Sequence, residues 1–402
     1  MFSFLTQSLW PALEVFTRLS YPTDPPANPD SFPNAPYYST GQQDIFFIIT
    51  CIAVMAILRD ALRLGVFEPF ARWKLMRDLR KRNIASVPGS PVKEKPSTNG
   101  HLNGNGHVAN GNGHAANGNG KTHHGNGHAA NGNGHIIGSG YSSPASLAGK
   151  PTTKQLKQVN RSVLRFAEQG WSVVYYTFSW SYGLYVHYHL PTKVLQPSAV
   201  WKNYPHIPLA LPVKFYYLVQ TAFYLHQILI LNAEARRKDF WQMMAHHIIT
   251  VGLLVLSYFT NFTRVGCIIL LLMDTCDIFL PLAKMIRYLE VSQLATDVIF
   301  GWFMVSWFVT RHFLFILVIW SAAYDATKYI PFVVDPSRGF YLTRTAYLAF
   351  VGMLIALQIL QCIWFWMICR VAYRVVTGSG AEDTRSDDEI EAENELDTQK
   401  DE

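Results

Sequence analysis

The sequence is poor in charged residues. Asp, Glu, Lys and Arg make up 15% of its 402 residues, whereas half of the residues are hydrophobic and 14% are aromatic. A typical soluble domain has about 25% charged residues. Two stretches, 88–152 and 378–402, contain few aliphatic residues and dilute a very apolar remainder. This balance excludes an ordinary soluble domain and predicts a membrane protein with two polar appendages.

The sequence also lacks a disulfide framework and a secretory leader. All five cysteines lie within apolar runs, so we expect free thiols that pack as small hydrophobic groups: Cys51, Cys267, Cys276, Cys362 and Cys369. No basic region followed by a short apolar stretch and a cleavage site opens the chain. We therefore expect the first membrane span to target the protein. The ending TQKDE is neither a KDEL nor a dilysine signal.

What the sequence has instead is long apolar segments. A helix of about 20 mainly apolar residues crosses the hydrocarbon core of a bilayer. Seven segments fit: 45–64, 171–190, 212–232, 240–259, 264–283, 295–320 and 343–370. They predict an all-α fold, a polytopic membrane helix bundle of about seven transmembrane helices.

The distribution of charge predicts an orientation. Basic residues follow the first span and gather near 236–238, 284–287 and 370–374, which places these clusters on one side. The positive-inside rule makes that side cytosolic, with the N-terminus lumenal and the C-terminus cytosolic. Residues 381–402 have eleven acidic and two basic side chains, a net charge of −9, so the first 380 residues of this +6 chain carry +15. A basic body suits a polyanionic substrate or anionic lipid headgroups.

The predicted domains follow from these segments. A lumenal segment, 1–44, precedes the first transmembrane helix, 45–64. A cytosolic basic segment with a disordered Asn/Gly/His linker, 65–152, leads to the membrane domain, 153–376, and an acidic cytosolic tail, 377–402.

The two appendages leave alternatives open. The linker is expected to be a plain spacer, with a metal-binding histidine tract as the alternative. Residues 153–169 have apolar and basic stripes at helical spacing, which predicts a helix on the membrane surface that leads into the second span. In the tail, Ser379 and Ser386 stand in an acidic context that suits an acid-directed kinase.

Two adjacent histidines, His246 and His247, lie inside the fourth predicted span. The short turn TNFTR joins this span to the fifth, so the two should form an antiparallel hairpin, with His246 and Asp277 at equal distances from its centre. Asp274 lies one helical turn from Asp277 and shares its face. An ionisable group inside a span costs about 2.5–3.5 kcal/mol on insertion and usually faces a cavity or a partner. The four residues predict a reaction site, and a polar clamp without chemistry is the alternative.

A metal centre is a weaker interpretation. The histidines outside the linker do not form HxxxH or HxxHH boxes, which disfavours a di-iron site. Adjacent helical residues point about 100° apart and rarely bind one ion together, which disfavours zinc at His246 and His247. We expect no metal.

The segment from Arg236 to Glu290 resembles the Lag motif of ceramide synthases, which belong to the TLC-domain family of endoplasmic reticulum membrane proteins. It carries the His-His pair, an N-F-T-R-x-G turn, a D-x-x-D pair and a following A-K-M. The TLC domain would cover about 155–375 and contain six of the seven spans. The homeobox-like segment of many animal members is absent, and the linker stands in its place, which suggests a fungal member.

The resemblance implies that a sphingoid base, dihydrosphingosine or phytosphingosine, is N-acylated by a fatty acyl-CoA to give ceramide and CoA. No cofactor is implied, because acyl-CoA is a substrate. We expect His246 to act as base or acyl acceptor and His247 to orient or protonate. Asp274 and Asp277 would bind the amine and hydroxyls and hold the imidazole tautomer.

Further expectations concern the partners of the site. Basic residues at the cytosolic mouth are candidates for the CoA phosphates, with topology signals as the alternative: Arg236, Arg237, Lys238, Lys284 and Arg287. The loop 321–344 is expected to close the acyl tunnel with Tyr329, Ile330, Phe332 and Val333, and the resemblance also associates this loop with acyl preference. Membrane lipids are expected partners and nucleic acid is not. An oligomer with another synthase or a small membrane subunit stays open.

A rival hypothesis comes from another class. A non-enzymatic TLC-type membrane protein, a lipid sensor or a translocon-associated chaperone, would keep the fold. Such a protein would not need two histidines and two aspartates inside the membrane, and their presence favours the enzyme.

Overall fold

The computed structural model describes residues 14–85, 151–233 and 239–377. Several predictions fall outside these ranges: the Asn/Gly/His linker, the acidic tail with Ser379 and Ser386, and the basic residues Arg236, Arg237 and Lys238. The chain divides into two compact units, one formed by 1–75 with 157–402 and the other by 76–156.

Helices form at all seven predicted segments. The first is α2 (Asp44–Leu62), which continues through a π-helical turn, η1 (Arg63–Phe67), into α3 (Glu68–Ala85). The others are α5 (Thr153–His189), α6 (Leu211–Ala233), α7 (Phe240–Phe259), α8 (Thr263–Asp277) with α9 (Phe279–Tyr288), and finally α10 (Gln293–Trp307) with η3 (Phe308–Leu314), α11 (Phe315–Tyr324) and α12 (Ala326–Tyr329), followed by α13 (Arg344–Val376). The fold is therefore all-α, as predicted.

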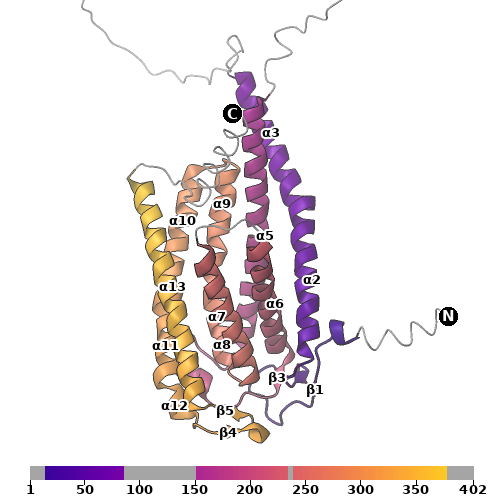
Figure 1. Ribbon diagram of the computed structural model, residues 1–402, viewed down its shortest axis with the longest axis vertical. Helices are drawn as coiled ribbons and strands as arrows, with labels where there is room; N and C mark the ends of the chain where they lie inside the picture. The colour runs from indigo at the N-terminus through magenta and orange to yellow at the C-terminus, as the bar shows by residue number, and fades with distance from the viewer. Residues whose placement is uncertain (1–13, 86–150, 234–238, 378–402) are drawn as a thin grey trace, which may run out of the picture. The chain divides into compact units, whose positions relative to one another are not determined.

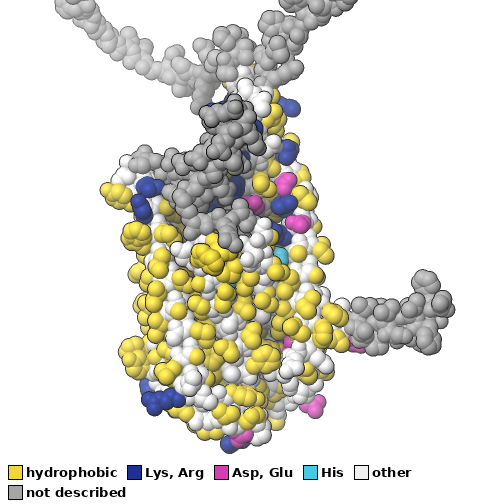
Figure 2. All heavy atoms as spheres, in the orientation of Figure 1, with side chains coloured by type: hydrophobic (Ala, Val, Ile, Leu, Met, Phe, Trp, Pro, Cys, Tyr) yellow, Lys and Arg dark blue, Asp and Glu magenta, His cyan; other side chains and the backbone are white. Residues whose placement is uncertain are grey.

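Five of these seven helices are long and apolar enough to cross a membrane, judged by length and composition; α5 and α6 are not among them. Burial explains why α6 has too many polar residues for a lipid-facing span: Lys214, Gln220 and His226 lie buried along it. A helix surrounded by protein does not need an apolar surface. The outer helices, in contrast, present a broad band of hydrophobic side chains on their surface, with Lys and Arg toward the ends (Figure 2).

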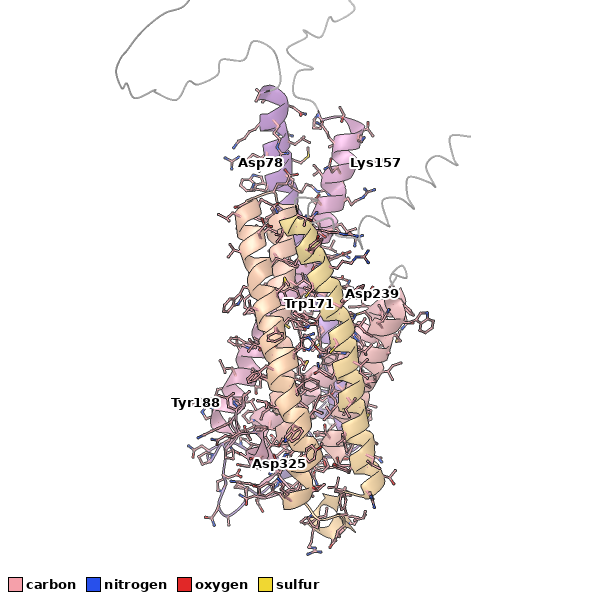
Figure 3. The ribbon with its side chains drawn as sticks, turned by 90° about the vertical axis from the view of Figure 1, so that its left-hand side faces the viewer. Asp78, Lys157, Trp171, Tyr188, Asp239 and Asp325 are labelled. Carbon is pink, nitrogen blue, oxygen red and sulfur yellow. The ribbon has the colours of Figure 1, made fainter. Side chains whose placement is uncertain are left out.

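Within the larger unit, α7 and α8 lie between α6 and α13 (Figure 1). The turn between α7 and α8 marks what we call the hairpin end of the bundle. The opposite end carries Asp239, the residue before α7; Figure 3 labels Asp239 and, at the hairpin end, Asp325.

The stretch 21–36 is rich in proline, which disfavours helix, and it forms no helix; short strands lie at its two ends. β1 (Pro22–Thr23), β2 (Tyr37–Tyr38) and β3 (Leu209–Ala210) form a three-stranded antiparallel sheet with Thr23 opposite Tyr37 and Tyr37 opposite Ala210. A second sheet pairs β4 (Val334–Asp335) with β5 (Phe340–Tyr341). The N-terminal stretch is thus paired through its backbone to the residues that precede α6.

The helix at 153–169 forms, but its apolar stripe does not rest on a membrane surface as predicted. Val163 and Phe166 are buried against Ala71 and Leu75 of α3 and Leu289 at the end of α9. Packing on neighbouring helices removes this apolar surface from lipid and water alike. In the smaller unit, Thr152 and Gln155 cap the start of α5 reciprocally, backbone to side chain, at 2.9 and 3.3 Å.

A buried ion pair fastens the N-terminal stretch to the bundle. The Lys214 ammonium lies 2.8 Å from the Asp44 carboxylate, and both side chains are almost fully buried. Lys214 also donates to the carbonyls of Ser20 and Ser39 at 2.7 and 2.8 Å, and the Tyr258 hydroxyl donates to Asp44 at 2.8 Å. The pair therefore connects α2, α6 and α7 with the strands.

We expect Lys214→Met to lower the free energy of unfolding by about 3–5 kcal/mol, because it leaves the Asp44 carboxylate buried without its counter-ion. Thermal unfolding in detergent micelles measures the loss. Lys202→Met, at an exposed lysine, is the matched control and should change little. Combining Lys214→Met with Asp44→Asn should recover part of the stability; an equal loss in the single and double variants would contradict the role of the pair.

Candidate active site

The two histidines lie near the start of α7. His246 is about 9 Å from the first residue of the helix at 1.5 Å per residue. The ring centroids of His246 and His247 are 5.4 Å apart. The Trp364 ring lies 5.3 Å from His246, and the Tyr224 ring lies within 6.2 Å of both histidines. The Nδ1 atom of each histidine is buried and has no hydrogen-bond partner among the described residues.

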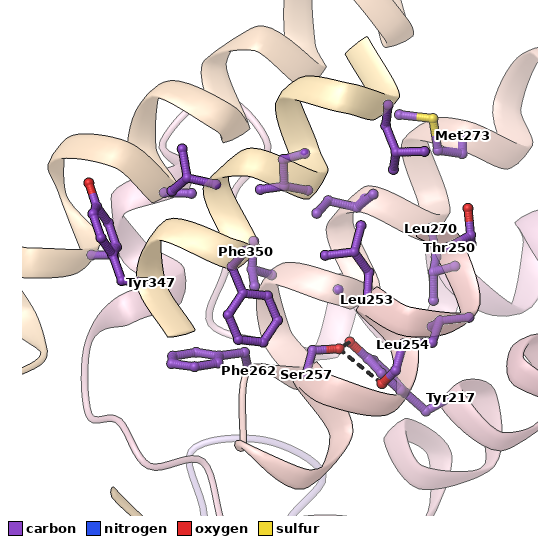
Figure 4. Close-up of a pocket in the computed structure, with 18 of the residues that line it drawn as sticks. Tyr217, Thr250, Leu253, Leu254, Ser257, Phe262, Leu270, Met273, Tyr347 and Phe350 are labelled. Atoms are coloured by element: carbon purple, nitrogen blue, oxygen red, sulfur yellow. Dashed lines mark hydrogen bonds between the residues drawn. The ribbon is translucent and has the colours of Figure 1, made fainter. Parts of the chain in front are cut away.

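His246 stands at one end of an apolar cavity. The cavity holds about 890 Å³ of space, part of it open to the outside. It runs between α7, α8 and α13 (Figure 4). Along α7 its lining extends from His246 to Ser257, about 16 Å at 1.5 Å per residue. The space suits an extended hydrocarbon chain whose polar end meets His246.

Few polar groups face this cavity besides His246. The Tyr217 hydroxyl and Ser257 Oγ satisfy each other at 2.9 Å, as Figure 4 shows. Gly266 of α8 allows this arrangement, since a Cβ atom there would lie 1.5 Å from the Tyr217 hydroxyl. Gly266 therefore lets α6 and α8 approach closely enough for the Tyr217 hydroxyl to reach Ser257.

The far end of the cavity is closed by residues other than those predicted. Trp201, Ala322, Ala326, Leu342 and Tyr347 line it, so the expected segment 321–344 does contribute.

The four residues expected to close the tunnel do not line the cavity. Tyr329, Phe332 and Val333 are exposed. Ile330 is buried in an apolar cluster with Ala326 and Leu342, which line the cavity, but Ile330 is not itself a lining residue. The stretch around Phe332 leads into β4, whose Val334 is exposed.

The predicted antiparallel hairpin of α7 and α8 is confirmed. Its turn has Asn261 in the left-handed region, at φ 64°, which asparagine tolerates better than most residues. The Asn261 amide donates to the carbonyl of Gly339 at 3.0 Å, and the Tyr204 hydroxyl donates to the carbonyl of Thr260 at 2.7 Å. Two loops distant in sequence thus fix the turn.

Asp274 of α8 is completely buried within a hydrogen-bond network. Ser179 Oγ donates to its Oδ2 at 2.6 Å and the Gln220 amide donates to the same atom at 2.7 Å. The Tyr175 hydroxyl donates to the Gln220 Oε1 at 3.1 Å. Asp274 Oδ1 has no partner among the described residues. The carboxylate is held by α5 and α6 and does not line the cavity.

Asp277 has a partner that the sequence analysis did not identify. The Arg311 Nη2 of η3 lies 2.6 Å from Asp277 Oδ2 and 2.7 Å from the carbonyl of Met273. The guanidinium also stacks on Trp307, 4.1 Å from the ring centroid. Equal depth in the hairpin predicts that His246 and Asp277 come within side-chain reach, but no hydrogen bond or ion pair joins them among the described residues. Equal depth along a hairpin does not determine which faces of the two helices meet. Here the Asp277 carboxylate forms an ion pair with Arg311 of η3 instead.

Arg311, Ser179 and Gln220 are thus site residues that the sequence analysis missed. A signal for Arg311 was present, because an arginine inside a predicted span demands a partner of opposite charge. Ser179 and Gln220 are neutral, and nothing in their spacing distinguishes them from other polar residues of α5 and α6.

The structure describes two of the five candidates for phosphate contacts. Lys284 and Arg287 lie on α9 toward the Asp239 end, three residues apart and therefore on neighbouring positions of one face. Among the described residues, no group of three His, Cys, Asp or Glu side chains is placed to hold a metal ion.

A second cavity, of about 720 Å³, lies at the hairpin end and is more polar. Arg264 of α8 forms an ion pair there with Asp30, with Nη2 2.7 Å from Oδ1. Burial, together with the Arg264 charge, lowers the pKa of His206 to about 4, so this imidazole stays neutral at physiological pH. The ion pair ties the turn that opens α8 to the N-terminal stretch.

The fold and the site together define a class: a polytopic membrane helix bundle with a His-His pair, two aspartates and an arginine in its interior. The model of the TLC domain family (TRAM, LAG1 and CLN8) matches residues 165–370. This match covers half of the sequence, and the chain belongs to the TLC-domain family.

Three relatives illustrate the similarity. Sphingosine N-acyltransferase lag1 of Schizosaccharomyces pombe is 42% identical over 244 residues, which cover 60% of this chain and 62% of the relative. Ceramide Synthase FUM18 of Gibberella moniliformis is 34% identical, with 58% and 60% covered. Ceramide synthase 4 of Mus musculus is 35% identical, with 56% and 54% covered. In each case the matched region spans less than two thirds of the relative.

We expect Gly266→Ala to displace Tyr217 and distort the cavity, because the added methyl group overlaps the hydroxyl. Overpacking of this kind costs typically about 1–3 kcal/mol. Gly252→Ala on α7 is the control, since the atom nearest to its Cβ is 4.0 Å away. Thermal unfolding in micelles should show a loss for Gly266→Ala and no loss for Gly252→Ala; equal behaviour would show that the close approach of Tyr217 is not needed.

Proposed function

We propose that this protein is a ceramide synthase, which N-acylates a sphingoid base with a fatty acyl-CoA and releases ceramide and CoA. Its TLC domain, the activities named in its relatives and the contents of the site support the proposal. The observation that carries it is the position of His246 at the head of an apolar cavity long enough for much of an acyl chain.

The proposed reaction exchanges a thioester for an amide. The neutral amine of the base attacks the acyl carbon, a C–N bond forms, the C–S bond breaks, and the amine proton passes to the departing CoA sulfur. A sphingoid ammonium is not a nucleophile until it loses a proton. His246 serves either as the base that takes this proton or as the first acyl acceptor, which then passes the acyl group to the amine.

The remaining site residues have separate roles in this proposal. His247 orients the reacting groups or serves as the proton donor. Asp277, whose side chain is partly exposed and paired with Arg311, binds the amine of the acceptor. Asp274 is fully buried and held by Ser179 and Gln220, so it acts as a positioning residue for α8.

The direction of entry follows from the cavity. The acyl chain points from His246 toward the hairpin end, so CoA stays at the Asp239 end, where Lys284 and Arg287 supply positive charge. The basic residues 236–238, which come directly before Asp239 in the sequence, stay candidates for the same role. We place that end in the cytosol and the hairpin end in the lumen of the endoplasmic reticulum, with the N-terminus lumenal and the C-terminus cytosolic. The proposed reaction uses no cofactor.

Replacing either histidine tests the site. We expect His246→Ala and His247→Ala to reduce ceramide formation at least a hundredfold, as removal of an acid–base group commonly does, while the protein still accumulates. Activity is measured with purified protein, dihydrosphingosine and acyl-CoA. Near-normal turnover in both variants would show that the reaction occurs elsewhere.

The two mechanisms for His246 differ in one measurable species. An acyl acceptor gains the mass of the acyl group when acyl-CoA is supplied without sphingoid base, and His246→Ala does not. Intact-mass spectrometry of wild-type protein distinguishes them, and an unmodified wild-type protein that makes ceramide supports the general-base role.

Chain-length preference should depend on the far end of the cavity. We expect Ala326→Leu to fill space there and shift the products of a ladder of saturated acyl-CoAs toward shorter ceramides. Val333→Leu, at an exposed position outside the cavity lining, is the control. An unchanged product profile in Ala326→Leu at full activity would place the determinant of length elsewhere.

A further inference from the structure

A group of polar side chains lies where η3 meets α13, away from the acyl cavity. The His312 Nδ1 and the Gln358 Nε2 are 2.8 Å apart and join the two helices. The Cys362 Sγ lies 3.5 Å from the same amide nitrogen. We call this contact the η3–α13 seam.

The seam lies at membrane depth. Gln358 is about 21 Å from the start of α13 at 1.5 Å per residue, well inside a helix of 33 residues. Neighbouring side chains on the same surface are apolar and exposed, as expected toward lipid: Phe313, Ile355 and Ile359. Polar groups at this depth carry a cost and usually have a functional partner.

Some polar atoms at and beside the seam lack hydrogen-bond partners within the described part of the protein. Two buried polar atoms of the seam, His312 Nε2 and Gln358 Oε1, have no hydrogen-bond partner among the described residues. Two more lie beside the seam on residues that contact α8, where Arg311 binds Asp277 and Gln361 contacts Met273: Arg311 Nε and Gln361 Oε1. A buried polar group left unpaired costs about 1–3 kcal/mol. Two of these atoms are carbonyl acceptors and one is a guanidinium donor. The imidazole Nε2 is also a donor, because Nδ1 accepts from the Gln358 amide. A ligand with several N–H and O–H groups would satisfy them.

The seam reaches the candidate active site. Gln361 precedes Trp364 by three residues, so the two share a face of α13, and the Trp364 ring contacts His246. On the other helix, His312 follows Arg311, which is paired with Asp277. The seam therefore lies between the lipid-facing surface and the histidine.

The backbone is irregular at the same place. η3, which carries Arg311 and His312, is a π-helical segment of seven residues between two α-helices. Such interruptions are rare and occur frequently at functional sites. This observation is independent of the unpaired atoms.

We propose that the headgroup of the acceptor lipid, a long-chain amino alcohol, binds in the η3–α13 seam and reaches His246 past Trp364. Its hydroxyls pair with Gln358 Oε1 and His312 Nε2, and its amine passes toward Gln361 and Asp277. The acyl chain occupies the cavity on one side of α13 and the acceptor enters from the other. This inference rests on the proposed function, since it assigns the second substrate of that reaction.

Paired changes in enzyme and substrate test the assignment. Gln358→Leu and His312→Phe are compared with wild type and with Ile359→Leu, the apolar neighbour, using dihydrosphingosine and analogues that lack the 1-hydroxyl or the 3-hydroxyl. We expect each seam variant to raise the KM for dihydrosphingosine about tenfold, the effect of one hydrogen bond, and to leave the KM for acyl-CoA unchanged. Removing the hydroxyl that the seam binds should raise the KM of the wild-type protein for the sphingoid base. The same removal should cause no further rise in the KM of the variant.

Photolabelling separates this inference from the proposed function. A photoactivatable sphingoid base is crosslinked to wild-type protein, and the labelled peptides are identified by mass spectrometry. Labels on 308–314 or 355–365 that Gln358→Leu reduces support the seam, even if no ceramide forms and the proposed function fails. Two results would overturn the inference and leave the proposed function standing. In one, the protein makes ceramide but the labels lie elsewhere. In the other, the protein makes ceramide and the missing hydroxyls raise the KM of the variants as much as that of wild type.

Discussion

The ion pair between Arg311 and Asp277 is the interaction on which the interior of this bundle depends. A bilayer offers no water to a charged side chain, so each charge at this depth needs a partner from another helix. Arg311 joins η3 to α8 through Asp277 and the Met273 carbonyl. The same constraint recurs where Lys214 meets Asp44 and where Ser179 and Gln220 hold Asp274. Polar contacts, rather than apolar burial alone, thus decide which helices are neighbours.

Two different environments lie on the two sides of α13. On one side the cavity is mostly apolar; the Tyr217 and Ser257 hydroxyls pair with each other there, and Thr250 Oγ1 has no partner among the described residues. On the other side, the seam with η3 retains polar atoms without partners. The proposed reaction, which joins a hydrocarbon chain to a polar amino alcohol, would use both environments beside His246.

The sequence predicted the helices because hydropathy and length respond to the bilayer, and it predicted the α7–α8 hairpin because the turn is short. It also singled out His246 and His247 on one helix of this hairpin and Asp274 and Asp277 on the other. It did not predict that Asp277 pairs with Arg311 or that Ala326 rather than Phe332 meets the cavity, because hydropathy says nothing about how each helix is rotated. Length and composition alone do not mark α6 as a membrane span, because it carries polar residues that are buried against protein.

The composition of α6 has a consequence for biogenesis. As the chain is inserted, α6 is a poor substrate for release into lipid by itself, because Lys214, Gln220 and His226 would lie unpaired in hydrocarbon. Asp44 and Ser179 precede it in the chain, whereas Asp274 follows two helices later. The helix that occupies the interior of the finished protein is therefore accommodated only as its neighbours assemble, and membrane insertion and tertiary folding become a single event for this part of the chain.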